Sequence, residues 1–185
     1  ASRCPPIVGF QTKDPQLNNP NCLGINETVL SKIKELSPQM IIMTAYWDIY
    51  TIDKLAGTIS ELQKHGVKTI ILIGSAPVWF ANPARIVFEK FKNDPFHRIP
   101  EEGSFDYISN QRQADAKIIA VARETGVEYV SVVDALCSAK GCRTFVGDQR
   151  GELAFSDNDH LSPAGAKFVV KEKLQMLLGQ LSTTR

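Results

Sequence analysis

Three stretches of the chain share one hydrophobic pattern: apolar residues three or four positions apart, a short break, and then a run of apolar and β-branched residues. The spacing predicts an amphipathic helix, and each run has the length of a strand. Few polar residues interrupt these runs, which is typical of a parallel sheet that helices cover on both faces. The predicted helix–strand pairs are Glu27–Leu36 with Met40–Ala45, Leu55–Leu62 with Lys68–Ile73, and Ala114–Ala122 with Glu128–Val133.

This alternation predicts an α/β fold with a doubly wound, flavodoxin-like parallel sheet and helices on both of its faces. Gly66 and Gly126 stand where the second and third helices should end, because glycine is the usual residue just past a helix. A last helix is predicted to begin at Ser162-Pro163, since serine is a favoured N-cap and proline suits the first turn.

Two stretches do not follow the pattern. Residues 1–24 are a loop-rich entry with four prolines, and residues 76–108 contain four more. We interpret the second stretch as a long insertion beside the site, because long ordered loops are often functional. Plain surface decoration is the alternative. With these stretches included, residues 1–185 are predicted to form a single domain.

Composition excludes several classes of protein. Apolar residues make up 43% of the 185, which is ordinary for a globular chain, and the net charge is only +1. No nucleic-acid partner is therefore predicted. The longest apolar runs are no longer than strands, so none spans a bilayer. The first residues are neither a signal peptide nor a start methionine, so we expect the chain to be cut from something longer.

The four cysteines, Cys4, Cys22, Cys137 and Cys142, allow three pairings. Their clustered spacing favours the local disulfides Cys4–Cys22 and Cys137–Cys142, with four reduced thiols as the alternative. No C-x-x-C is present and the chain has only three histidines, so no zinc site is predicted. Disulfides would indicate a periplasmic or extracellular protein.

Candidate site residues follow the predicted strands, because ligands of such sheets bind beyond the carboxyl ends of the strands. Tyr46, Trp47 and Asp48 follow the first strand, Ser75 the second and Asp134 the third. We predict that Tyr46, Trp47 and Ser75 contact substrate. Ordinary strand-end packing is the alternative for Trp47.

The segment before the last helix carries the most chemistry. His160 stands three residues after Asp157 in a predicted turn. A carboxylate that accepts a hydrogen bond from Nδ1–H fixes the imidazole tautomer that a general base needs. Asp159, the immediate neighbour of His160, is expected to point elsewhere. The alternative is that both aspartates only supply negative charge near a helix N-terminus.

A histidine–aspartate pair also needs a nucleophile. Ser75 has the best position of the serines, but Ala76-Pro77 follows it and no G-x-S-x-G occurs, so we interpret it as a residue that lines the site. No glycine-rich phosphate loop is present, and no cofactor is predicted.

The segment 157–166, Asp-Asn-Asp-His-Leu-Ser-Pro-Ala-Gly-Ala, resembles the carboxyl-terminal Asp-x-x-His block of SGNH hydrolases. More closely, most of the chain resembles the SGNH domain of family 3 membrane acyltransferases, which O-acetylate bacterial surface glycans. The resemblance implies an SGNH-type fold, a periplasmic location, a membrane acyltransferase domain in the parent chain, and a Ser–His–Asp triad with His160 and Asp157. The segments that carry it are Cys4–Cys22, Met40–Tyr50, Gly66–Pro77, Asp134–Cys142 and Gly151–Ala166.

Two family features are absent. The nucleophile of the family lies in a Gly-Asp-Ser block after the first strand, and this sequence contains no such block. Its place would be upstream of Ala1, together with the first βα unit. The family's Gly-x-Asn-Asp is replaced by Ala45-Tyr46-Trp47-Asp48, so the oxyanion donor of the missing asparagine would come from backbone, Trp47 Nε1 or the upstream segment.

The leading hypothesis is acyl transfer on a glycan, as an O-acetyltransferase or esterase, with a serine from upstream. A non-catalytic glycan-binding or assembly module is the alternative. A metal phosphoesterase with Asp134, Asp157, Asp159 and His160 as ligands ranks last. A missing central strand would leave sheet edges unpaired. Either residues 6–10 substitute for it or, as we expect, a second copy or an amino-terminal fragment supplies it.

Overall fold

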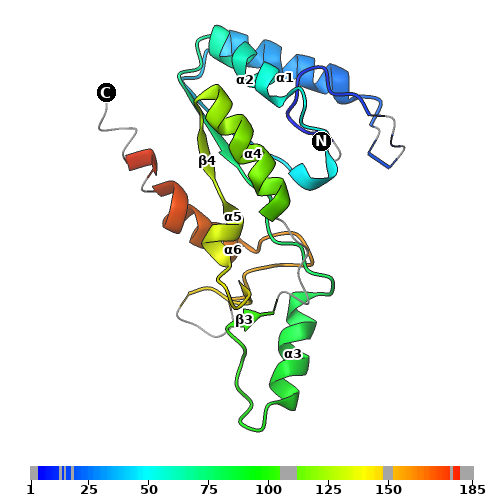
Figure 1. Ribbon diagram of the computed structural model, residues 1–185, viewed down its shortest axis with the longest axis vertical. Helices are drawn as coiled ribbons and strands as arrows, with labels where there is room; N and C mark the ends of the chain where they lie inside the picture. Colours follow the sequence, from blue (N-terminus) through cyan, green and yellow to red (C-terminus); the bar gives the residue numbers. More distant parts are fainter. Residues whose placement is uncertain are drawn as a thin grey trace. The chain divides into compact units, whose positions relative to one another are not determined.

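The computed structural model describes residues 4–12, 14, 16–17, 19–104, 112–147, 152–175 and 177–179 (Figure 1). The chain divides into two compact units: the first contains Ala1–Ser75 and Gln113–Val130, and the second contains Ala76–Arg112 and Ser131–Arg185. Buried apolar side chains occur in both units. The expectation of a single domain stays a prediction, because two compact units can still unfold together.

The first unit is built on a parallel sheet, as the sequence predicts. Its strands β1 (Met40–Thr44), β2 (Thr69–Ile73) and β4 (Glu128–Val130) lie in the order β1-β2-β4. Met40 pairs with Thr69, and Ile71 pairs with Glu128. The three strands run in the same direction, so their carboxyl ends meet at one edge.

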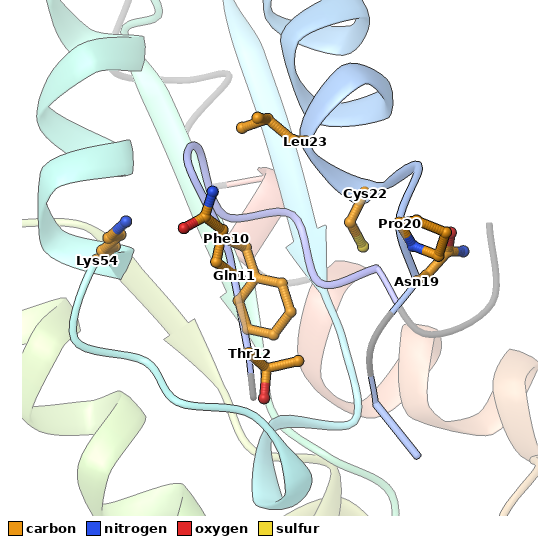
Figure 2. A pocket seen from close by; sticks show the side chains of 8 residues that line it. All are labelled: Phe10, Gln11, Thr12, Asn19, Pro20, Cys22, Leu23 and Lys54. Carbon is orange, nitrogen blue, oxygen red and sulfur yellow. The ribbon is translucent and has the colours of Figure 1, made fainter. Parts of the chain in front are cut away.

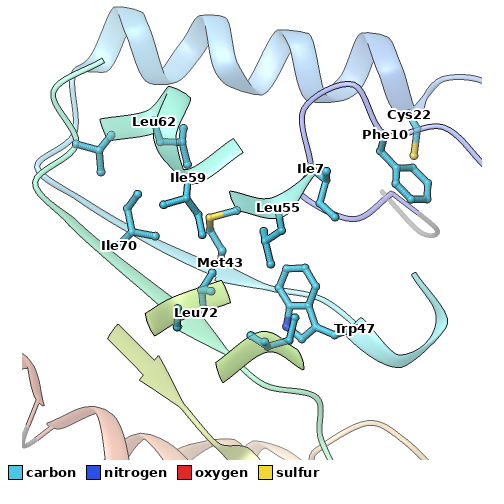
Figure 3. Close-up of a cluster of buried hydrophobic side chains, with 13 residues drawn as sticks. Ile7, Phe10, Cys22, Met43, Trp47, Leu55, Ile59, Leu62, Ile70 and Leu72 are labelled. Atoms are coloured by element: carbon cyan, nitrogen blue, oxygen red, sulfur yellow. The ribbon is translucent and has the colours of Figure 1, made fainter. Parts of the chain in front are cut away.

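Helices α1 (Cys22–Leu36), α2 (Leu55–Lys64) and α4 (Arg112–Thr125) contribute to one buried cluster, which Figure 3 shows. Each helix contributes apolar residues at helical spacing, so the residues that form the predicted apolar pattern are the ones that pack in the core. Against them lie Met43 of β1 and Ile70 and Leu72 of β2. All three helices therefore pack on the same face of the sheet. The helical members are Leu30, Ile33, Leu55, Ile59, Leu62, Ile118, Val121 and Ala122.

Strand β1 departs from the expectation that both faces of the strands are covered. The central strand β2 is buried at Ile70, Ile71 and Leu72, but Ile42 of β1 is 47% exposed. The difference follows from position, because β2 has a neighbour on each side whereas β1 ends the sheet among the described strands.

The entry loop is closed by the predicted disulfide between Cys4 and Cys22. The amide nitrogen of Asn26 donates to the carbonyl oxygens of Pro5 (3.0 Å) and Ile7 (2.8 Å), which fixes this loop against α1. Helix α1 begins at Cys22, five residues before the predicted Glu27. Residues 6–10 form a turn rather than a strand, so the alternative in which they substitute for a missing strand is wrong.

The second unit contains the stretch 76–108, where we expected a loop-like insertion. Helix α3 (Pro83–Asn93) lies within it. Asn82 caps this helix by accepting the N–H of Ala84 (2.9 Å), and Pro83 occupies the first turn. The prolines that indicated a loop are here partly a helix-start signal.

The third predicted strand is too long. Strand β4 ends at Val130, and helix α5 (Val132–Leu136) begins two residues later. The Ser131 hydroxyl accepts the N–H of Asp134 (3.0 Å), which is N-cap geometry. Asp134 consequently lies in the first turn of α5, not directly after a strand.

The second unit also contains a two-stranded sheet, a disulfide and the last helix. Strands β3 (Glu102–Gly103) and β5 (Cys142–Arg143) pair antiparallel, and the predicted Cys137–Cys142 disulfide is present. Helix α6 (Pro163–Val169) begins as predicted: Ser162 Oγ accepts the N–H of Gly165 (3.0 Å). A π-helical turn, Val170–Leu174, continues it. Among the described residues, no helix is long and apolar enough to cross a membrane.

Candidate functional site

The turn before α6 brings together the two residues predicted to form a pair. His160 Nδ1 lies 2.9 Å from Asp157 Oδ2 and 3.0 Å from Oδ1. The same carboxylate accepts the backbone N–H groups of Asp159 (3.1 Å) and His160 (2.8 Å). The aspartate thus closes its own turn and holds the imidazole of the residue three positions later. The predicted contact is confirmed.

Hydrogen bonding shifts the pKa of both partners. The two backbone N–H groups, followed by the imidazole, lower the pKa of Asp157 to about 2. The hydrogen bond and charge of Asp157, with the charge of Asp159 in addition, raise the pKa of His160. The His160 side chain is 74% exposed, and the described part of the chain places no hydrogen-bond partner on Nε2. This nitrogen can therefore exchange a proton with a bound molecule.

We expected the Asp159 side chain to point away from the His160 ring, and this expectation is wrong. Its Oδ1 lies 3.0 Å from His160 Nδ1, so two carboxylates share one ring nitrogen. The backbone N–H of Asp159 also donates to the Asp157 carboxylate, so both aspartates belong to the same tight turn. Ligand atoms of Asp157, Asp159 and His160 lie within 4.8 Å of one another, which a divalent cation would accept. Asp134, the fourth ligand of the metal hypothesis, is not in this group.

The first unit contains a second polar cluster, at the carboxyl ends of β1 and β2. Ser75 Oγ accepts the backbone N–H of Trp47 (3.0 Å) and donates to Asp48 Oδ1 (3.4 Å). Trp47 Nε1 donates to the carbonyl oxygen of Ile73 (2.7 Å). Trp47 begins a short 3-10 helix, Trp47–Ile49, so these bonds tie the segment after β1 to the end of β2. We call Trp47, Asp48 and Ser75 the strand-end lock.

Burial limits what the strand-end lock can do. Trp47 and Ser75 are each 3% exposed. The Nε1 donor of Trp47 is bonded to Ile73, so Trp47 packs at the strand end and this donor is not available for an oxyanion. Tyr46, the third predicted substrate contact, is half-buried. A substrate-binding role for Tyr46, Trp47 and Ser75 stays a prediction.

Asp48 has a shifted pKa that the sequence did not indicate. Partial desolvation, opposed by the Ser75 hydrogen bond and reinforced by the charge of buried Asp115, raises the pKa of Asp48 to about 6. Gly74 allows this crowding, because a Cβ there would lie 2.8 Å from Asp115 Oδ1 and closer still to the Tyr129 hydroxyl. The signal was divided among three distant segments, so no local motif could reveal it.

The first unit also contains a cavity of about 660 Å³ beside the entry loop (Figure 2). Lys54, which donates to the carbonyl of Gly9 (2.6 Å), lies across it from Asn19 and Pro20. Lys54 is the one charged residue in the described lining, so this cavity has no acid–base pair. None of the predicted catalytic residues lines it. The lining is Phe10, Gln11, Thr12, Asn19, Pro20, Cys22, Leu23 and Lys54.

Comparison with solved structures identifies relatives of the fold. A lipopolysaccharide acetyltransferase periplasmic domain from Salmonella ser. Paratyphi A superposes with a TM-score of 0.73 and 24% identity, over 91% of this chain and 66% of that one. A GDSL-like lipase from Bacteroides thetaiotaomicron matches with a TM-score of 0.47 and 14% identity, over 84% of this chain and 71% of that one. The chain thus spans about two thirds of the Salmonella domain. A search of the curated proteins finds no match.

At the level of sequence, residues 1–174 match the family described as the SGNH domain fused to AT3 domains. The match extends from the entry loop through the Asp157–His160 turn into the last helix. It agrees with the parallel sheet of the first unit and with the superposition on the Salmonella domain. The chain therefore belongs to the family of SGNH domains that are fused to AT3 domains.

Proposed function

We propose that this domain takes part in acyl transfer to or from a glycan, with His160 as the general acid–base and Asp157 as the residue that orients it. The single observation that carries the proposal is the Asp157 carboxylate at 2.9 Å from Nδ1 of His160, whose side chain is 74% exposed. The nucleophilic serine comes from outside these 185 residues, because the sequence holds no Gly-Asp-Ser block.

The proposed reaction has two halves. His160 Nε2 takes the proton of the serine hydroxyl as its oxygen attacks the acyl carbonyl, and returns it to the departing alkoxide, which leaves an acyl-enzyme. A sugar hydroxyl or water then gives its proton to His160 and attacks the acyl carbonyl, and His160 returns that proton to the departing serine oxygen as the acyl–serine bond breaks. Asp157 stabilises the imidazolium formed in each half. The acceptor decides between an O-acetyltransferase and an esterase.

The charges in the turn suit this role. A carboxyl with a pKa of about 2 is ionised at neutral pH, so Asp157 there presents a charged acceptor to Nδ1. Neutral His160 is the competent base. Because Asp157 raises the pKa of His160, activity should fall as the pH drops below that raised value. Without the charge of Asp157, the acid limb should move to lower pH.

The family supplies the context of the proposal. Its description names fusion to AT3 domains, which supports a membrane acyltransferase domain in the parent protein. The two disulfides support an oxidising compartment, and we propose the periplasm. The acyl donor would arrive from the membrane domain, and the acceptor would be a surface glycan.

The test uses a version extended at its amino-terminal side to include a Gly-Asp-Ser block, with a small acyl ester as substrate. His160→Ala should lower kcat/KM by about 10²–10⁴-fold, the usual contribution of acid–base catalysis. Asp157→Asn should lower kcat and shift the acid limb down in pH. Asp159→Asn is the matched control, because Asp159 contacts the same nitrogen without closing the turn, and it should cost less than Asp157→Asn.

Two outcomes would contradict this assignment. If a chelator removes the activity, the cluster of Asp157, Asp159 and His160 works as a metal site, as its spacing permits. If the extended version retains glycan binding but hydrolyses no ester, the domain is a binding or assembly module.

A further inference from the structure

The turn that carries Asp157 and His160 is held at its middle by a residue far away in the sequence. The backbone N–H of Trp79 donates to the carbonyl oxygen of Asn158 (2.8 Å), and the Asn158 side-chain amide donates to the carbonyl oxygen of Trp79 (3.2 Å). Asn158 follows Asp157 directly, and all four residues belong to the second unit. One residue of the turn is thus bonded twice to one residue of the stretch 76–108.

Trp79 is itself firmly held. It is only 1% exposed, and its ring packs edge-to-face on Phe155 with the ring centroids 5.6 Å apart. The ring also lies so close to Gly103 that a Cβ at that position would clash with it. A side chain packed this closely has little room to move. The backbone of Trp79 can therefore act as a fixed support for Asn158.

The ends of the turn are fixed as well. Phe155 and Leu161 pair in an antiparallel bridge on either side of it. Because the ring of Trp79 contacts Phe155 and its backbone bonds to Asn158, Trp79 supports the turn both at one end and at its middle. Without the bonds to Asn158, the residues between the two ends would be held only by contacts among themselves.

The Asp157–His160 pair needs such support because it lies near the surface. The side chain of Asp157 is 49% exposed and that of His160 is 74% exposed. Exposed ion pairs contribute little free energy, since water screens the charges and both side chains lose rotamer freedom. A group that transfers a proton must nevertheless stay within about 0.5 Å of its productive position. The backbone of the turn must therefore supply the precision that the pair itself cannot.

We propose that Asn158 is a positioning residue of the site: its two hydrogen bonds with Trp79 hold the turn in the conformation in which Asp157 accepts Nδ1–H of His160. Asn158 acts through the imidazole tautomer, because only the form with its proton on Nδ1 leaves Nε2 as a base. The inference deepens the proposed function and rests on it only where activity is measured.

The first test measures the His160 tautomer by NMR of the imidazole nitrogens, on the 185-residue chain and at a pH at which the ring is neutral. Asn158→Ala removes the side-chain donor, and Asn158→Leu removes it but keeps most of the volume. Both variants should lower the ratio of the Nδ1–H form to the Nε2–H form about threefold to tenfold, the usual effect of one hydrogen bond. The rings of His65 and His97, outside the turn, are internal references.

Hydrogen exchange and a matched variant locate the effect. In Asn158→Ala, the Trp79 amide should exchange at least about threefold faster, because its acceptor carbonyl is held less firmly. The Ala154 amide, which donates to the carbonyl oxygen of Thr144 (3.0 Å), should be unchanged and so report that the unit stays folded. Ser156→Ala, at an exposed position of the same turn, should change the tautomer ratio by less than about twofold.

Activity separates positioning from substrate binding. In the version extended to include a Gly-Asp-Ser block, both Asn158 variants should lower kcat about threefold to tenfold and leave KM within about twofold. A changed tautomer ratio in the 185-residue chain supports the role of Asn158 even if the extended version is inactive, which would contradict only the proposed acyl chemistry.

Three results would overturn the proposal. An unchanged tautomer ratio in both Asn158 variants would mean that Asp157 and His160 hold their own geometry. A lower kcat without a change in this ratio would mean that Asn158 contacts the substrate instead. An equal change of the ratio in Ser156→Ala would mean that any substitution loosens the turn.

Discussion

The strand-end lock and the turn before α6 are both polar clusters, but they use their polar side chains in opposite ways. In the strand-end lock, the Ser75 hydroxyl and the Trp47 indole are buried and bonded to groups of their own unit. In the turn before α6, Asp157 is half-buried and His160 is exposed; Nδ1 of the ring is held by Asp157, and no described residue bonds to Nε2. Buried polar groups must be bonded internally, so they build structure, whereas an exposed, oriented group keeps a lone pair for chemistry.

The clusters also differ in the direction of their pKa shifts. Desolvation raises the pKa of Asp48 to about 6, whereas backbone N–H donors lower that of Asp157 to about 2. Folding thus opposes the charge of the first carboxyl and favours that of the second. Substitutions in the strand-end lock should therefore mainly change stability, and substitutions in the turn before α6 should mainly change activity.

The largest expected difference in the free energy of unfolding is between the variants Trp47→Ala and His160→Ala. Trp47→Ala removes a buried ring and leaves the Ile73 carbonyl without its indole donor, so the free energy of unfolding should fall by about 3–5 kcal/mol. His160→Ala should change it by no more than about 0.5 kcal/mol, because the side chain is exposed. Urea unfolding measures both. Equal losses would mean that the turn is a structural element too.

The two disulfides allow a second comparison between the units, because each closes a loop of different length. Replacing Cys4 and Cys22 by serine opens a loop with a sequence separation of 18, against 5 for Cys137 and Cys142. Loop-closure entropy predicts losses of about 3 and about 2 kcal/mol in the free energy of unfolding. Unfolding of the two double variants tests the order. A larger loss for the shorter loop would show that contacts, not chain entropy, dominate.

A smaller loss is expected at Ser75. Ser75→Ala leaves the Trp47 N–H without its acceptor in a buried place and should cost about 1–3 kcal/mol. Ser156→Ala, in the exposed turn of the second unit, is the matched control and should stay within about 0.5 kcal/mol. Ester hydrolysis by the extended version should survive Ser75→Ala. Its complete loss, with the fold intact, would make Ser75 the nucleophile.

The pH dependence of stability should have opposite signs in the two clusters. The folded pKa of Asp48 lies above its ordinary value of 3.8, so its contribution to stability falls as the pH rises from about 4 to about 6. Asp157 contributes stability above about pH 4, which is lost as the pH falls toward 2. Unfolding of Asp48→Asn and Asp157→Asn across this range should each remove one slope. An unchanged profile in Asp48→Asn would contradict the raised pKa.

The smallest expected difference concerns the two units themselves. Each unit contains one of the two tryptophans, Trp47 in the first and Trp79 in the second, and both are buried. Trp47→Phe leaves fluorescence that reports on the second unit, and Trp79→Phe leaves the first. If residues 1–185 form a single domain, each variant should show one urea transition, at the same midpoint by fluorescence and by circular dichroism. Two separate transitions would divide the chain into independent domains.

Local pattern was sufficient to predict most of the sheet and its helices. Strands β1 and β2 and helix α2 lie within a residue or two of their predicted bounds, because the apolar positions that define their patterns are also positions that pack in the core. The errors fall where a cap competes with the pattern. Ser131 starts α5 inside a run of valines that reads as strand, and Asn82-Pro83 starts α3 inside a proline-rich stretch. Both caps are visible in the sequence, but the apolar run is also typical of a strand and the prolines are also typical of a loop.

The candidate site was predictable only where it is local. Asp157 and His160 are three residues apart, and a turn suffices to join them. The orientation of Trp47 depends on Ile73, and the pKa of Asp48 depends on Ser75 and Asp115. These partners come from different elements, so their contact is a property of the folded sheet and not of any sequence window.

Asn26, which anchors the entry loop, is also a residue that a eukaryotic host could glycosylate. Asn26-Glu27-Thr28 has the sequence that such hosts glycosylate, and the attachment atom is the side-chain nitrogen. That nitrogen is 2.8 Å from the Ile7 carbonyl and 3.0 Å from that of Pro5, in a residue only 8% exposed. A sugar attached there during synthesis would prevent the loop from docking on α1. Secreted eukaryotic expression therefore calls for Thr28→Ala, which removes the acceptor sequence and keeps the asparagine.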